Sequence, residues 1–206
     1  GSGAYTLHHG MSIINNSLLQ TTGAGDIVLN GASSSDNGVQ LATGGDVQTT
    51  GTGSIFITGN GAVYDINMAG DAGTTILATG GGAIRLAADV LNIASDIPVI
   101  SASATGTVTI VPRTRGRAIS VGGTDSAGVV LGIADEELDR ITASIMQIGD
   151  ANSGAITLDA LISPATYETL ALSNNSRFTS SSGFASTIGN TATSYKRISV
   201  VGTLTI

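Results

Sequence analysis

A five-residue pattern of polar and hydrophobic positions recurs along the chain. A glycine is followed by any residue, an aliphatic residue, any residue and a second aliphatic residue. The pattern begins at Gly25, Gly53, Gly82, Gly106, Gly154 and Gly202. Residues two apart in a strand share a face, so the two aliphatic positions predict a short strand with one buried face.

The spacing of this pattern indicates a repeat architecture. Its first aliphatic residues are separated by 28, 29, 24, 48 and 48 residues, and 48 is twice 24. A period near 25 residues is typical of a solenoid coil and too short for a β-α-β unit, which needs about 30. We therefore predict an all-β chain folded as a right-handed parallel β-helix (β-solenoid) of about seven to eight coils.

Stacked coils would place equivalent residues in interior ladders. The first predicted ladder contains Ile27, Ile55, Ile84, Val108, Ile156 and Leu204. The second contains Leu29, Ile57, Leu86, Ile110, Leu158 and Ile206. Between the motifs, further aliphatic pairs predict the next face of each coil: Val39 with Leu41, Ile66 with Met68, Leu91 with Ile93, Ile119 with Val121, and Leu170 with Leu172.

One charged segment departs from the strand pattern. Residues 134–141 are rich in acids, and Leu138, Ile141 and Ile145 follow at helical spacing. Asp135 is a suitable N-cap residue, and acids are favoured in the first turn of a helix. We predict a short amphipathic helix over 134–141, inserted at a coil corner, which would account for the first doubled step.

Composition and charge narrow the possible partners. Charged residues are only 11% of the chain, whereas hydrophobic residues reach 41% and argue against disorder. The net charge of −7 opposes binding to nucleic acid or to an anionic membrane surface. The longest nearly apolar run, residues 127–134, is far shorter than the roughly 20 residues of a membrane span. We expect no nucleic-acid partner and no membrane insertion by this segment.

The two ends of the sequence suggest a fragment. Residues 1–3 (Gly-Ser-Gly) are interpreted as vector-derived, and the chain stops at Ile206 inside a predicted strand. We therefore treat 4–206 as a single solenoid segment of a longer protein. Its open ladder ends are expected to fray or to self-associate.

The most specific motif lies in residues 131–157. Here Leu138-Asp139-Arg140-Ile141-Thr142 is followed by Ile148-Gly149-Asp150-Ala151-Asn152-Ser153-Gly154-Ala155-Ile156-Thr157. This stretch resembles the recurring unit of filamentous-haemagglutinin-like proteins, which are long repetitive proteins on the surface of Gram-negative bacteria. The resemblance implies a right-handed parallel β-helix, an extracellular or cell-surface location, and a role in adhesion, biofilm formation or presentation of a distal effector. Because the shaft of this family has no catalytic motif, no functional residue is carried over.

Three arginines form the most distinctive candidate site. Arg113, Arg115 and Arg117 could contact acidic glycans through their guanidinium groups. Alternatively, the acidic run at 135–139 lies about one coil further on and could neutralise them, for example by pairing Arg115 with Glu136. The second interpretation is favoured, because neither cluster would then carry unbalanced charge.

Metal and cofactor sites have little support. Residues 150–154 resemble the start of a calcium loop, but position 12 of such a loop would be Leu161, so a plain Asx turn is favoured. His8 and His9 are adjacent and would point to opposite sides of a strand. We expect no metal and no cofactor.

These observations leave two main functions open. The favoured one is a structural shaft segment of a secreted or cell-surface adhesin, whose partners are the neighbouring coils of its own chain. The alternative is a shaft segment that itself binds host-surface or matrix glycans or proteins. A polysaccharide-processing enzyme is a distant third, because the chain has one lysine and scattered aromatics. Ice binding is disfavoured, because the Thr-x-Thr pairs at 107–109 and 203–205 do not recur in the other motifs.

Overall fold

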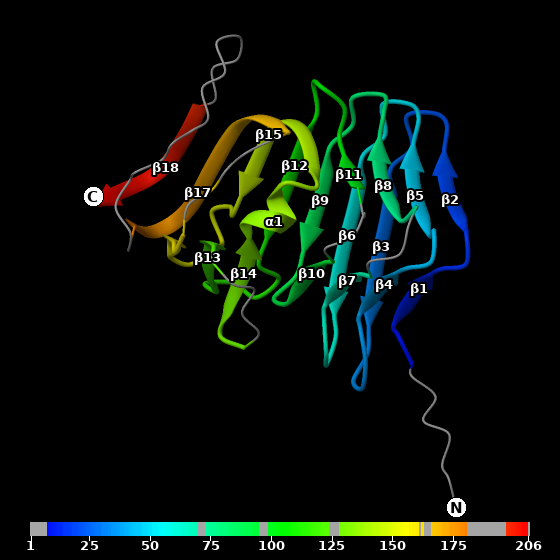
Figure 1. Ribbon diagram of the computed structural model, residues 1–206, viewed down its shortest axis with the longest axis horizontal. Helices are drawn as coiled ribbons and strands as arrows, with labels where there is room; N and C mark the ends of the chain where they lie inside the picture. Colours follow the sequence, from blue (N-terminus) through cyan, green and yellow to red (C-terminus); the bar gives the residue numbers. More distant parts are fainter. Residues whose placement is uncertain are drawn as a thin grey trace, which may run out of the picture.

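The chain is wound as a β-solenoid of stacked parallel sheets (Figure 1). The computed structural model describes residues 8–69, 73–94, 99–123, 128–160, 162, 166–180 and 197–205, and only the backbone within 175–180 and 197–205. The all-β parallel architecture confirms the prediction, but the stack has about five turns rather than seven to eight. Residues 1–3, and Ile206 of the second predicted ladder, lie outside the described residues.

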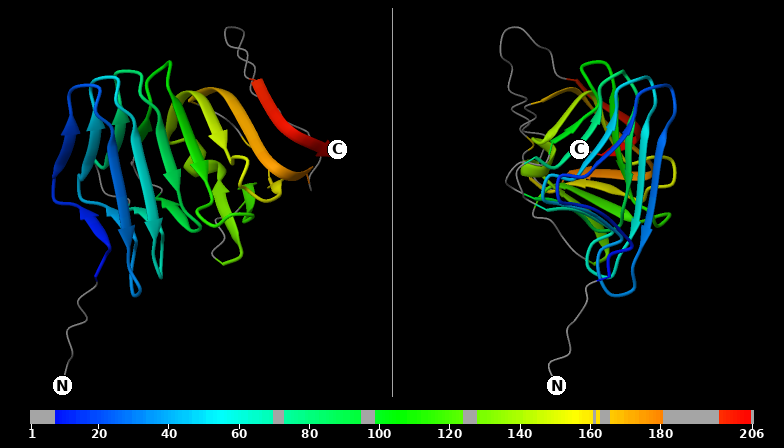
Figure 2. Two further views of the ribbon diagram at one scale, coloured as in Figure 1. Left: turned by 180° about the vertical axis from the view of Figure 1, so that it is seen from behind. Right: turned by 90° about the vertical axis from the view of Figure 1, so that its right-hand side faces the viewer.

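The first four turns each contain three strands. The first turn has β1 (Met11–Ile13), β2 (Leu18–Thr21) and β3 (Ile27–Ala32), and the second has β4 (Val39–Leu41), β5 (Asp46–Thr49) and β6 (Ile55–Asn60). The third has β7 (Ile66–Met68), β8 (Thr75–Ala78) and β9 (Ile84–Ala87), and the fourth has β10 (Leu91–Ile93), β11 (Val99–Ser101) and β12 (Thr107–Val111). Equivalent strands of successive turns lie over one another when the stack is viewed from its end (Figure 2).

The turns build three faces. The first face is the sheet β1-β4-β7-β10, and the second face runs through β2, β5, β8 and β11. The third face runs through β3, β6, β9 and β12. The second and third faces both continue onto β15 (Ile141–Ile148), whose beginning pairs with β11 and whose end pairs with β12.

The interior ladders follow the predicted register through these four turns. On the third face, Ile27, Ile55, Ile84 and Val108 are in register, as are Leu29, Ile57, Leu86 and Ile110. All eight are buried, and those of the second turn onward are at most 1% exposed. The predicted pairs at 39–41, 66–68 and 91–93 form the first face. Alternation of inward aliphatic and outward polar residues thus accounts for the core.

Beyond the fourth turn, the predicted ladders are wrong. Val108 is in register with Met146, and Met146 with Leu170, so the third-face ladder bypasses Ile156. Ile156 is in register with Ile119 instead, in a continuation of the first face that also includes Phe178 and Leu204. The short motif specifies a strand with one buried side. It does not specify which of the three faces of the solenoid that strand joins. The segment at 145–148 joins the ladder without a preceding glycine.

An inserted pair of strands explains the irregular step. The third-face step from Val108 to Met146 is 146 − 108 = 38 residues, whereas the next, from Met146 to Leu170, is 24. The extra length holds β13 (Ala118–Gly122) and β14 (Val130–Ala134), which pair in parallel. The sheet order is β14-β13-β16, where β16 is Ile156–Leu158, so β14 lies on the β10 side of β13 although it follows β13 in sequence.

The predicted helix is present but much shorter. Helix α1 spans only Asp135–Leu138, and its N-cap residue is Ala134 rather than Asp135. Ile141 starts β15, and Ile145 lies outward on that strand and is 38% exposed. The helical spacing of these aliphatic residues was therefore misleading, because parallel pairing with β11 and β12 outweighs the local helical tendency.

The stack ends in two long strands. β17 (Tyr167–Ser180) pairs first with β15 on the third face and then with β16 on the first face. β18 (Arg197–Thr205) pairs along β17 over both parts. Leu170 and Leu172 therefore continue the third-face ladder instead of forming the next face. In the part of the chain that the structure describes, no helix is long and apolar enough to cross a membrane.

Candidate functional site

Two of the three candidate arginines pair with buried carboxylates. At the corner between the third and first faces, Arg113 Nη2 donates a hydrogen bond to Asp89 Oδ2 at 3.0 Å. Arg113 Nε lies 3.7 Å from Asp65 Oδ2, and Arg117 Nε lies 3.8 Å from Asp89 Oδ1. Asp65 and Asp89 are only 2% and 6% exposed. We call these four residues and Thr114 the corner cluster.

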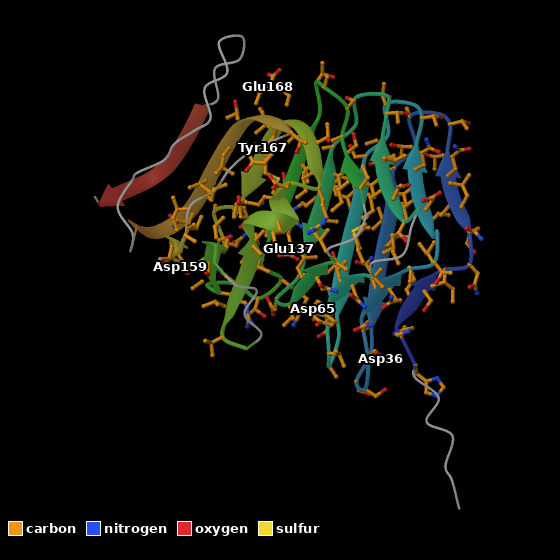
Figure 3. All side chains as sticks on the ribbon, viewed as in Figure 1. Asp36, Asp65, Glu137, Asp159, Tyr167 and Glu168 are labelled. Carbon is orange, nitrogen blue, oxygen red and sulfur yellow. The ribbon has the colours of Figure 1, made fainter. Side chains whose placement is uncertain are left out.

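Backbone groups complete the corner cluster. Asp65 accepts hydrogen bonds from the N–H groups of Gly61 and Asp89, which tie the corner loop of one turn to the next. Asp89 accepts the N–H of Thr114 at 2.8 Å and also its hydroxyl. Each carboxylate is thus held by several donors, as a buried charge requires. Asp65 lies at this corner in Figure 3.

The structure separates the three arginines. Arg115 is exposed and lies outside the corner cluster. The carboxylates that neutralise Arg113 and Arg117 are Asp65 and Asp89, so the expectation that the acidic run at 135–139 does so is wrong. A usable signal was present: Asp65, Asp89 and Arg113 are each 24 residues apart, which is one coil. That spacing puts them at one corner of successive turns.

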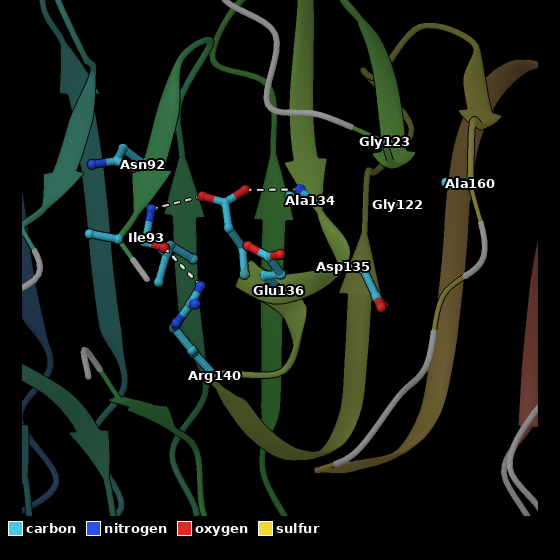
Figure 4. Close-up of a pocket in the computed structure, with 11 residues that line it drawn as sticks. Asn92, Ile93, Gly122, Gly123, Ala134, Asp135, Glu136, Arg140 and Ala160 are labelled. Atoms are coloured by element: carbon cyan, nitrogen blue, oxygen red, sulfur yellow. Dashed lines mark hydrogen bonds between the residues drawn. The ribbon is translucent and has the colours of Figure 1, made fainter. Parts of the chain in front are cut away.

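A second polar site closes a gap in the first face. No backbone pairing joins β10 to β14. Instead, Glu137 bridges the two strands: its Oε1 accepts the N–H of Ile93 at 2.8 Å and its Oε2 accepts the N–H of Ala134 at 2.9 Å (Figure 4). Arg140 Nη1 donates to the carbonyl of Ile93 at 3.1 Å. We call Glu137, Arg140 and the strand positions that they bind, Ile93 and Ala134, the seam.

A pocket of about 670 Å³ lies beside the seam. Its lining includes Asn92, Gly122, Gly123, Asp135, Glu136 and Arg140. A neighbouring pocket of about 490 Å³ is lined in part by Ser120, Thr157 and Asp159, and the Ser120 hydroxyl donates to Asp159. Glu137 and Arg140, which also line this first pocket, are bound to strand backbone, so these polar groups serve the fold.

Side-chain amides form a third polar array, on the outer side of the first face. Asn92 Nδ2 donates to Asn67 Oδ1 at 2.6 Å, and Asn67 Nδ2 donates to Gln40 Oε1 at 2.8 Å. Asn37 Nδ2 also donates to Gln40 Oε1. These bonds connect three consecutive turns, β4, β7 and β10. Such amide ladders stabilise stacked parallel strands.

The predicted Asx turn at 150–154 is confirmed. Asp150 Oδ1 accepts the N–H of Asn152 at 2.8 Å, and the Ser153 hydroxyl accepts the N–H of Asp150. Asp150 Oδ2 lies 3.2 Å from Arg85 Nη2 on β9.

His9 Nδ1 lies 3.0 Å from Asp36 Oδ2. Within the described ranges, no group of three or more His, Cys, Asp or Glu residues is placed to hold a metal ion.

Tyr167 is a buried titratable side chain near helix α1. It begins β17 and is 2% exposed. Burial raises the pKa of the Tyr167 hydroxyl above its usual range, and the charges of Asp135 and Asp139 raise it further. The acidic run that was expected to face the arginines therefore lies close to a buried tyrosine.

The fold and the polar arrays together define the chain as a parallel β-solenoid. Its described polar side chains mainly join one turn to the next. Comparison of the chain with family models, with curated proteins and with solved structures gives no match.

Proposed function

We propose that this chain is a structural shaft segment of a bacterial cell-surface or secreted adhesin, which projects binding or effector regions away from the cell. The observation that carries the proposal is the third-face ladder. It runs in unbroken parallel pairing through β3, β6, β9, β12, β15, β17 and β18. Each added strand lengthens such a stack by about 4.8 Å, so this architecture converts chain length directly into reach.

The use of polar side chains supports a shaft. Arg113 and Arg117 are paired with buried carboxylates of earlier turns. The amides of Asn67 and Asn92 are bonded to one another, and Glu137 joins two strands. Groups that would otherwise be available to a ligand are used for stacking.

The segment that resembles filamentous-haemagglutinin-like proteins has a structural role at each conspicuous position. Leu138 and Ile141 are fully buried, and Arg140 binds the backbone of Ile93. Asp150 forms the turn that leads from β15 toward β16, and Ser153 is buried in it. A motif whose residues build the coil suits a shaft.

The alternative function is direct binding of host or matrix glycans. Its support is Arg115, which is exposed and available beside the corner cluster. Arg113 and Arg117 would have to leave buried carboxylates to contact a glycan. That cost favours the shaft over the alternative.

A distance measurement tests the shaft. The chain has no cysteine, so spin labels can be placed at Ala24→Cys and Ala151→Cys, two exposed loop positions at opposite parts of the stack. A rigid shaft gives one narrow distance distribution that does not change with salt. A broad or bimodal distribution would contradict a load-transmitting rod.

A glycan array at physiological salt tests the alternative. We expect no reproducible binding by the unlabelled chain. Binding to a defined acidic glycan that is lost in Arg115→Ala, but kept in Arg85→Ala, would replace the shaft with the glycan-binding function. Arg85 is a suitable control, because it is a partly exposed arginine on strand β9, outside the loop that holds Arg115.

A further inference from the structure

We propose that Glu137 is an acid-sensitive latch, which holds the first face closed at the seam and releases it when its carboxyl group takes up a proton. The second and third faces continue past the fourth turn through β15, whereas the pairing of the first face is interrupted between β10 and β14. Hydrogen bonds from side chains bridge this interruption. The first face can therefore open here while the other two faces stay paired.

Glu137 and Arg140 take the place of a neighbouring strand beside β10. The N–H of Ala94 donates to the Met68 carbonyl at 3.0 Å, so the backbone groups of Ala94 point toward β7. Because this direction alternates along a parallel strand, the N–H and C=O groups of Ile93 point into the seam. Glu137 Oε1 accepts that N–H at 2.8 Å, and Arg140 Nη1 donates to that carbonyl at 3.1 Å (Figure 4). Side chains thus bind both polar groups of this strand position.

The latch needs a charged carboxylate. Glu137 is only 5% exposed, and its second oxygen accepts the N–H of Ala134 at 2.9 Å. A proton on either oxygen would turn an O–H donor toward an N–H donor and remove one of the two acceptors. Burial alone favours a neutral carboxyl group, but two N–H donors and the nearby guanidinium group of Arg140 favour the charged one. The closed seam therefore holds the charged form, and a proton favours the open seam.

The other charged groups near Glu137 do not reverse this preference. The described acidic residues around it are Asp135 and Glu136 on α1, Asp139 after α1, and Asp159 after β16. The last three are exposed, so their surroundings change little when the seam opens, and their protonation contributes little to the difference between the two states. Asp135 is half-buried and points away from the seam (Figure 4). Within their bounds, β10, β13, β14 and β15 contain no charged residue.

Acid should therefore open the seam. In the open state the carboxyl group is an ordinary exposed glutamate, for which the pKa is about 4.3. The open state then takes up a proton that the closed state excludes. The closed state is fully favoured above about pH 4.3, and its population relative to the open state falls by up to about tenfold for each pH unit below that value. Opening frees the N–H groups of Ile93 and Ala134 together.

Hydrogen exchange at single backbone amides, followed by NMR between about pH 3 and 7, tests the latch. Rates are expressed as protection factors, which remove the intrinsic pH dependence of exchange. The protection factors of Ile93 and Ala134 should fall by up to about tenfold per pH unit below about pH 4.3. Ala94 is the internal control, because it follows Ile93 on the same strand but bonds to β7. Its protection should stay constant.

Two variants identify the group that takes up the proton. Glu137→Gln has no carboxyl group, so Ile93 should be weakly protected at every pH, with no further fall in acid. Glu136→Gln changes the exposed neighbour and should keep the wild-type profile.

Several outcomes would overturn the proposal: constant protection of Ile93 in the wild type, an equal fall at Ala94, persistence of the pH dependence in Glu137→Gln, or its loss in Glu136→Gln. The wild-type comparison of Ile93 with Ala94 is decisive even if Glu137→Gln does not fold. The inference does not rest on the shaft function, which the spin-label distance tests separately.

Discussion

The carboxylate of Glu137 accepts a hydrogen bond from the backbone N–H of Ile93, a residue 44 positions earlier in the chain. The other oxygen of the same carboxylate accepts the N–H of Ala134. A buried strand edge needs partners for its N–H groups. One side chain therefore takes the place of a missing row of inter-strand hydrogen bonds between β10 and β14.

Replacing Glu137 should loosen the seam. Glu137→Gln leaves one acceptor oxygen and turns an amide donor toward a second N–H, so we expect the free energy of unfolding to fall by about 1–3 kcal/mol. Hydrogen exchange should accelerate at the amides of Ile93 and Ala134 before the rest of the stack. Glu136→Gln makes the same change at the exposed neighbouring residue and should alter neither quantity. Equal effects of the two variants would show that charge, not the bridge, is responsible.

The corner cluster predicts unequal roles for neighbouring arginines. Arg113→Ala should lower the free energy of unfolding by about 1 kcal/mol, because the ion pairs of Arg113 are partly exposed to solvent. Arg115→Ala should change it by less than about 0.5 kcal/mol, since exposed sites away from such contacts are usually neutral. Urea denaturation of both variants measures the difference. A larger loss in Arg115→Ala would argue against the cluster.

Asp89 should matter more than either arginine. Asp89→Ala leaves two guanidinium groups and the N–H of Thr114 without their acceptor, so a loss of about 3 kcal/mol is expected. Asp26→Ala is a comparison at an exposed carboxylate that accepts one backbone N–H, from Ser54, and should cost about 1 kcal/mol. Equal losses in the two variants would show that Asp89 acts as a single hydrogen-bond acceptor and not as the centre of a cluster.

Cross-linking can test the ladder beyond the fourth turn. Thr109 on β12 is in register with Gln147 on β15. Facing residues on adjacent strands have Cα atoms within the range of about 4.4–6.8 Å that a disulfide needs. The pair Thr109→Cys and Gln147→Cys should therefore oxidise readily. The pair Thr109→Cys and Thr157→Cys follows from motif spacing alone and should not. The reverse outcome would restore the simple 24-residue ladder.

The buried tyrosine predicts a loss of stability in alkali. The pKa of Tyr167 is raised in the folded chain by burial and by Asp135 and Asp139, so the folded state holds its proton at a pH where the unfolded state has lost it. Stability from this site is therefore complete below the ordinary tyrosine pKa of about 10 and declines as pH rises above it. Tyr167→Phe should flatten the decline of the melting temperature between about pH 10 and 11.

Much of the fold was accessible from residue patterns. The alternation at Ile27 and Leu29, repeated at Ile55 and Ile57, specified both the buried face of each strand and the neighbour that it pairs with. Two features make this inference local. Side chains alternate across a strand whatever its surroundings, and a coil of constant length returns equivalent residues to one position. Asp65, Asp89 and Arg113 follow the same rule, with a spacing of 24 residues.

Other features depend on contacts between distant segments. The motifs at Gly154 and Gly106 both predict a strand, yet the two strands lie on different faces of the solenoid. A hydrophobic pattern with a period of two residues indicates which side of a strand is apolar. It does not indicate which sheet edge the strand pairs with. β14 follows β13 in sequence and yet occupies the position between β10 and β13, where Glu137 completes the seam. Local sequence thus determined strands, turns and the first four coils. The order of β13 and β14 and the partner of Glu137 depend instead on which strand edges distant segments leave open, and no local pattern specifies that.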